Sequence, residues 1–148
     1  IFDERSGGVF TGDTFGISYR EFDVDGREFI FPTTTPVQFE QEAAHDSIDL
    51  IMSHHPRSAY LTHYGRVTQL PRLADDLHRM IDDFVKIAEG VRDAGATRHQ
   101  QLVAGLERHL QECLGAHGCR LAPDETRALL EHDIELNAQG LEVWMDKA

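Results

Sequence analysis

Apolar residues in the second half of the chain recur at steps of three and four, which is the spacing of one face of an α-helix. The first such series is Leu73, Leu77, Met80, Ile81, Phe84, Ile87, Ala88 and Val91. Gly95 closes this predicted helix, and Thr97 can cap a second helix that ends before Gly115. Pro123, followed by two acidic residues, predicts a third helix start. A short tail helix is expected from Leu141 through Trp144.

The first 67 residues lack this period and instead contain short apolar runs bounded by glycine and other turn residues. Val9–Thr11, Phe29–Phe31 and Ala59–Thr62 are predicted as strands, because β-branched and aromatic residues favour extended backbone. Tyr19–Phe22 is predicted as a further extended piece. Asp23–Gly26 is predicted as a turn.

One helix is predicted inside this first part, from Thr35 to about Ser53. Thr35 is a plausible N-cap, Pro36 suits the first helical position, and Gln38 completes a capping-box pattern. Pro56 lies just beyond the predicted helix end. Strands and a helix followed by further helices predict an α/β fold with a helical extension.

The composition narrows the classes of partner. The 148 residues include 26 acidic and 14 basic side chains, a net charge of −12. Nucleic acid is not expected as a partner, because neutralising phosphates requires a concentrated basic surface. No apolar run reaches the roughly 18 residues that span a bilayer, so no membrane partner is expected. Two cysteines are too few for a disulfide scaffold and favour a reducing, cytoplasmic location, with a single disulfide bond as the alternative.

Two segments place metal-binding side chains directly after predicted strands. Asp13 follows the first strand, between Gly12 and Gly16, and His63 follows the strand that ends at Thr62. The carboxyl ends of strands are where sheet proteins build their sites. Taken singly, each residue has a commoner structural interpretation. Asp13 would be a turn aspartate that hydrogen-bonds its own backbone, and His63 would be a histidine with a structural role.

The segments VFTGDTFG (9–16) and YLTHYGRV (60–67) together resemble the later part of a metallo-β-lactamase-superfamily hydrolase. The resemblance implies a helix-sheet-sheet-helix sandwich and two divalent metal ions, with zinc expected first and iron or manganese as alternatives. It implies that Asp13 bridges the two ions and that His63 ligates one of them. A metal-bound hydroxide would then attack an ester, thioester or similar bond of a small-molecule substrate.

The chain departs from the family pattern in one respect. The family's His-x-His-x-Asp-His cluster lies upstream of the GDT segment, and this sequence contains no His-x-His. We therefore expect a C-terminal portion of a longer hydrolase, inactive alone. Residues 1–67 would be the C-terminal part of the hydrolase domain, and residues 68–148 a helical extension.

Four residues beside the expected ligands are candidates for a substrate pocket: Thr14, Phe15, Tyr19 and Tyr64. The alternative is that Phe15 and Tyr19 pack in the core. The alternative function is a non-catalytic helical interaction or oligomerisation module, in which residues 68–148 pair with a second copy or with another partner. A hydrolase that forms a homo-oligomer through the same helices is a third possibility. His109, Cys113, His117 and Cys119 match no standard zinc spacing, and we interpret them as structural.

Overall fold

The computed structural model describes residues 1–36 and 38–147. In these residues the chain is an α/β protein with one mixed four-stranded sheet and four helices, about 58% helical. It divides into two compact units. Unit 1 comprises Ile1–Thr33 and Gln41–Ile81, and unit 2 comprises Thr34–Glu40 and Asp82–Ala148. Among the described helices, none is long and apolar enough to cross a membrane.

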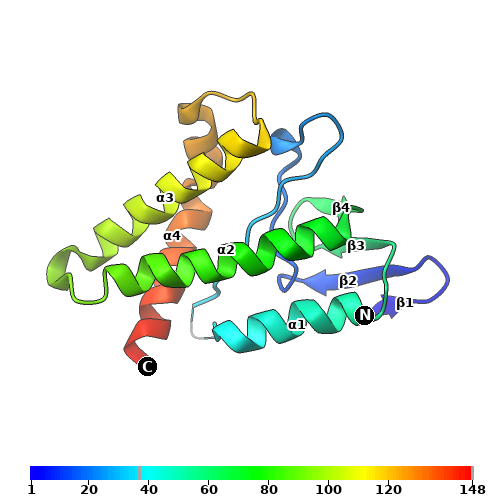
Figure 1. Cartoon of the computed structure of the whole chain (residues 1–148), viewed down its shortest axis with the longest axis horizontal. Coiled ribbons are helices and arrows are strands. Elements are labelled where there is room, and N and C mark those ends of the chain that lie inside the picture. The colour runs from blue at the N-terminus through cyan, green and yellow to red at the C-terminus, as the bar shows by residue number, and fades with distance from the viewer. Residues whose placement is uncertain (37, 148) are drawn as a thin grey trace. The chain divides into compact units, whose positions relative to one another are not determined.

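Unit 1 contains the sheet, whose strands lie in the order β1-β2-β3-β4 (Figure 1). The strands are β1 (Phe2–Asp3), β2 (Gly8–Gly12), β3 (Ser58–Leu61) and β4 (Gly65–Val67). β2 and β3 are parallel, whereas β1 pairs with β2 and β4 pairs with β3 in antiparallel fashion. The strands predicted over 9–11 and 59–62 are thereby confirmed, and β1 and β4 are additional.

The core of unit 1 lies against one face of the sheet. Val9, Ala59 and Val67 are neighbours in the register of β2, β3 and β4, and all three are buried. Because side chains alternate across a strand, these three residues share one face of the sheet, and that face is buried. Helix α1 (Gln41–Ser53) adds one fully buried side chain, Ile48.

The segment between β2 and α1 differs from the prediction. Arg20–Phe22 forms a 3-10 turn, so the extended piece predicted over Tyr19–Phe22 is wrong. Phe29–Phe31 is buried as expected but joins no strand of the described sheet. The backbone of Phe31 pairs instead with Ile17 in an isolated bridge. The aromatic rings of this segment pack on one another, so the segment is buried without the strand-to-strand hydrogen bonds of a sheet. The predicted turn over Asp23–Gly26 is confirmed by the Val24–Arg27 bridge.

Helix α1 begins at Gln41, and the predicted start at Thr35–Pro36 is therefore wrong. The segment before α1 belongs to unit 2, where tertiary contacts override the capping pattern. The backbone N–H of Thr34 donates to Asn137 Oδ1 at 2.6 Å, and Phe39 lies edge-on to Trp144. These contacts hold the segment out of a helical course.

Unit 2 is helical. Helix α2 (Leu70–Gly90) passes from unit 1 into unit 2, and α3 (Arg98–His117) and α4 (Pro123–Lys147) follow. A short 3-10 turn, Gly95–Thr97, precedes α3. In Figure 1, α3 and α4 lie against each other, and their buried leucines form the core between them. The predicted helices over these regions are confirmed.

The separate tail helix predicted from Leu141 is wrong, because α4 runs unbroken to Lys147. The glycine just before it, Gly140, does not end the helix and has another role. A Cβ at this position would lie 1.6 Å from the carbonyl oxygen of Thr34. Gly140 therefore allows the backbone of Thr34 to lie directly against the helix.

Candidate functional site

The two expected metal ligands lie side by side at one edge of the sheet. Asp13 directly follows β2 and His63 follows β3, and these two strands are parallel. Asp13 Oδ1 lies 3.4 Å from His63 Nε2, although fifty positions separate the residues in the sequence. The carboxyl ends of two adjacent parallel strands thus bring a carboxylate and an imidazole together.

Tight turns hold both side chains at this edge. After β2, the N–H of Thr14 donates to the Thr11 carbonyl and the N–H of Gly16 donates to the Asp13 carbonyl. After β3, the N–H of Thr62 donates to the Gly12 carbonyl at 3.4 Å, which ties the two loops together. Tyr64 then adopts a left-handed backbone (φ 75°), unusual for a bulky residue and frequent at functional sites.

The Asp13–His63 contact is accessible and contributes little to the fold. Each side chain is 51% exposed. Ion pairs at such exposure are worth about 0–1 kcal/mol, so the pair is not needed for stability. Carboxylate oxygen and imidazole nitrogen both suit zinc or iron, which bond each donor at about 2 Å and can therefore span 3.4 Å. Within residues 1–36 and 38–147, no group of three or more His, Cys, Asp or Glu side chains could hold a metal ion.

The four pocket candidates separate into two pairs. Phe15 and Tyr19 are buried in the core of unit 1, as the structural alternative expected. Tyr64 is 50% exposed and stacks on Tyr19, with ring centroids 4.3 Å apart. Thr14 is exposed and lines a groove of about 320 Å³ next to α1. Thr14 and Tyr64 are therefore exposed neighbours of Asp13 and His63 in the sequence, and the ring of Tyr19 packs on that of Tyr64.

A second polar cluster in unit 1 was not anticipated from the sequence. His45 and Asp49 lie one turn apart on α1, and His78 lies on α2. The Nδ1 atoms of His45 and His78 are 2.6 Å apart, and His78 Nε2 lies 3.1 Å from Asp49 Oδ1. The spacing of His45 and Asp49 was the available signal, but nothing in the sequence pairs them with His78.

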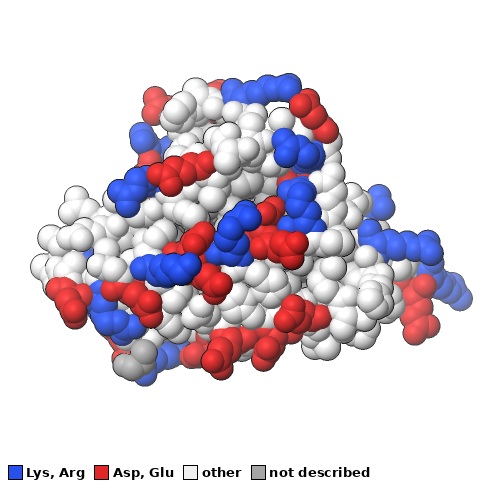
Figure 2. All heavy atoms as spheres, in the orientation of Figure 1, with Lys and Arg blue, Asp and Glu red and all other residues white. Residues whose placement is uncertain are grey.

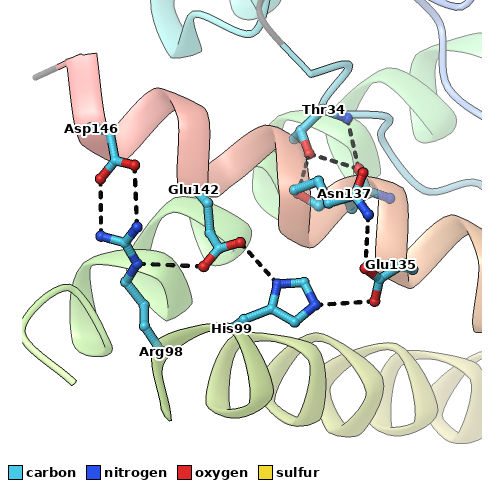
Figure 3. A network of polar contacts seen from close by, with 8 residues as sticks. Thr34, Arg98, His99, Glu135, Asn137, Glu142 and Asp146 are labelled. Atoms are coloured by element: carbon cyan, nitrogen blue, oxygen red, sulfur yellow. Dashed lines mark hydrogen bonds and ion pairs between the residues drawn. The ribbon is translucent and has the colours of Figure 1, made fainter. Parts of the chain in front are cut away.

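A polar network in unit 2 joins α3 to α4 (Figure 3). His99 lies between Glu142, 2.8 Å from Nδ1, and Glu135, 3.1 Å from Nε2. Hydrogen bonding to Glu142 is the main factor that raises the pKa of His99 above its ordinary value. Arg98 contacts Glu142 and binds both carboxylate oxygens of Asp146. The network has the character of an interhelical clamp, because each nitrogen of His99 already has a carboxylate partner.

The cysteine and histidine residues of α3 do not converge on a metal site. His109 Nε2 lies 3.6 Å from Cys113 Sγ and 3.4 Å from Asp83 Oδ2, so one ring nitrogen serves both contacts. Phe84 packs edge-on to the His109 ring. These contacts join α3 to α2 within unit 2.

Charge is distributed rather than concentrated on the surface in view. Figure 2 shows basic and acidic side chains interspersed on this face. The composition nevertheless gives a net charge of −12. Comparisons of the chain with protein-family models, with curated proteins and with solved structures return no match.

Proposed function

We propose that this chain forms part of a metal-dependent hydrolase of the metallo-β-lactamase superfamily, in which Asp13 and His63 are metal ligands. The observation that carries the proposal is the 3.4 Å approach of Asp13 Oδ1 to His63 Nε2. Two residues chosen from separate motifs meet at the carboxyl ends of parallel strands, with the two atom types that bind zinc.

Asp13, His63 and Tyr64 have distinct roles in this proposal. Asp13 offers carboxylate oxygens, which can be shared between two cations, and His63 offers Nε2. The bound ions would supply the nucleophile and polarise the bond to be cleaved. Tyr64, stacked on Tyr19, presents an exposed ring beside the ligands and can orient an ester or thioester substrate.

The second face of the sheet supports the finer fold proposal, in which this sheet is one half of a helix-sheet-sheet-helix sandwich. Phe10, Tyr60 and Arg66 are neighbours in the register and point away from the buried face. Phe10 is 53% exposed and stacks on Tyr60 with centroids 4.9 Å apart. A partly exposed aromatic pair in the centre of a sheet face is suited to packing against a second sheet.

The proposal requires ligands beyond Asp13 and His63. The twelve residues before Asp13 contain no histidine, so the family's upstream cluster would have to come from outside this chain. The alternative, a helical interaction module, has no specific observation in its favour. Among the described residues of unit 2, Leu136 is the one large apolar side chain that is exposed, and a single exposed leucine is a small surface for pairing with another helix.

Hydrolysis by the longer protein tests the proposal. We expect an in-frame His-x-His-x-Asp-His segment upstream of the codon for Ile1, and zinc-dependent cleavage of simple esters or thioesters. Asp13→Ala and His63→Ala should each lower kcat/KM by about a thousandfold or more, whereas His132→Ala on α4 should leave it unchanged. A reading frame without that segment, or full activity in Asp13→Ala, would overturn the proposal.

A further inference from the structure

His45, His78 and Asp49 form a chain of two hydrogen bonds. Asp49 Oδ1 lies 3.1 Å from Nε2 of His78 and can accept its hydrogen. In that tautomer Nδ1 of His78 carries a lone pair and accepts the Nδ1 hydrogen of His45 across 2.6 Å. A cation bound between the rings would replace this second hydrogen bond, with the His45 hydrogen moved to Nε2.

This arrangement is that of a metal-binding histidine. Histidine ligands in proteins usually donate their second N–H to a carboxylate, which fixes the ring and raises the basicity of the other nitrogen. Asp49 has this relation to His78. The rings of His45 and His78 are stacked, with centroids 4.9 Å apart and an interplanar angle of 14°. Their facing nitrogens come from two different helices.

We propose that His45 and His78 bind one divalent transition ion such as Zn²⁺ through their Nδ1 atoms, with Asp49 as the residue that positions His78. Two imidazoles on one tetrahedral Zn²⁺ have nitrogens about 3.3 Å apart, so the rings need to separate by less than about 1 Å. His78 is partly exposed, with 28% of its side chain accessible, which allows both ring movement and ion entry. Water would complete the coordination.

The ion would connect α1 to the first part of α2 within unit 1. This role differs from that proposed for Asp13 and His63, which lie after strands β2 and β3. Soft or borderline cations are expected at two imidazoles, whereas Mg²⁺ prefers oxygen ligands and should not bind. Zn²⁺ that binds the folded state should raise Tm in a concentration-dependent way.

Calorimetric Zn²⁺ titration of the 148-residue chain tests the site, in an Asp13→Ala/His63→Ala background that removes the other candidate ligands. We expect one Zn²⁺ to bind and Tm to rise, with no response to Mg²⁺. Adding His45→Gln or His78→Gln should weaken binding at least about tenfold and abolish the rise in Tm. Asp49→Ala should weaken binding by about tenfold, the usual cost of losing such a carboxylate.

His132→Gln, a change at an exposed histidine of α4, is the matched control and should leave Zn²⁺ binding unchanged. Equal Zn²⁺ affinity in the background protein and in both histidine variants would overturn the proposal. Absence of Zn²⁺ binding in the background protein would overturn it as well. Neither result bears on hydrolysis, because Asp13 and His63 are already replaced in every sample.

Discussion

At the scale of single residues, the loop that carries Asp13 depends on Gly16. The N–H of Gly16 donates to the Asp13 carbonyl, and the backbone of Gly16 has φ +74°. A Cβ on Gly16 would lie 2.5 Å from the Phe31 carbonyl oxygen and 2.9 Å from a methyl group of Leu77. Glycine is therefore required there both for its conformation and for the space that it leaves.

Gly16→Ala should lower the free energy of unfolding by about 3 kcal/mol, the sum of left-handed strain and overpacking. Gly26→Ala is the matched control, because Gly26 has φ +78° but a Cβ added there would meet no atom within 4 Å. It should cost about 1 kcal/mol from strain alone. Urea unfolding measures the free energy of unfolding of both variants. Equal losses of stability in the two would contradict the close approach of the Phe31 carbonyl oxygen to Gly16.

At the scale of secondary-structure elements, hydrogen bonds to α4 hold the segment that precedes α1. Thr34 donates through its N–H to Asn137 Oδ1, and its hydroxyl contacts both Asn137 Oδ1 and the Asn137 carbonyl. Both residues are almost fully buried. Burial makes these bonds costly to lose, because an unpaired buried N–H cannot turn to water.

Asn137→Ala should lower the free energy of unfolding by about 2 kcal/mol, because it leaves the Thr34 N–H without its acceptor. Gln139→Ala, on the same helix, removes an exposed hydrogen bond to Glu135. That control should change stability by no more than about 0.5 kcal/mol. Chemical denaturation compares the two, and a loss for Asn137→Ala no larger than the control's would contradict the role of α4 in holding this segment.

The clamp between α3 and α4 should make the stability of unit 2 depend on pH. Hydrogen bonds to Glu142 and Glu135 raise the folded-state pKa of His99 above 6.5. Its stabilisation is therefore fully present below the unfolded pKa and is lost as pH rises through the raised folded pKa. The difference in unfolding free energy between wild type and His99→Gln should be largest below pH 6.5 and should shrink as pH rises through the raised folded pKa of His99.

NMR titration of the His99 ring checks the same clamp directly. Its midpoint should lie above 6.5 in the wild-type chain and should fall in Glu142→Gln, which removes the main partner. A midpoint that Glu142→Gln leaves unmoved would show that the 2.8 Å contact does not hold in solution.

At the scale of the whole molecule, the sequence predicts what local pattern determines. Helical periodicity identified α2, α3 and α4, and the short apolar runs located β2 and β3. The start of α1 and the continuity of α4 were not predictable, because both depend on contacts between Thr34 and residues about a hundred positions away. The same limit applies to His45 and His78, whose pairing is set by how α1 packs against α2.

Asp13 and His63 could be selected from the sequence because each directly follows a predicted strand, and their role as metal ligands stays a prediction. Their neighbours were predicted less well. Phe15 and Tyr19 share the hydrophobic character of pocket residues and of core residues, and sequence pattern alone does not separate the two.

Metal content is the most direct measure of whether Asp13 and His63 are ligands. We expect the longer hydrolase that is proposed above, purified without added chelator and with His45→Gln to remove the other proposed site, to contain about two divalent ions per chain. Asp13→Ala and His63→Ala should each reduce this content, and His132→Ala should not. Metal content that stays the same in both ligand variants, or that is absent from every form, would contradict the assignment of these two residues as ligands.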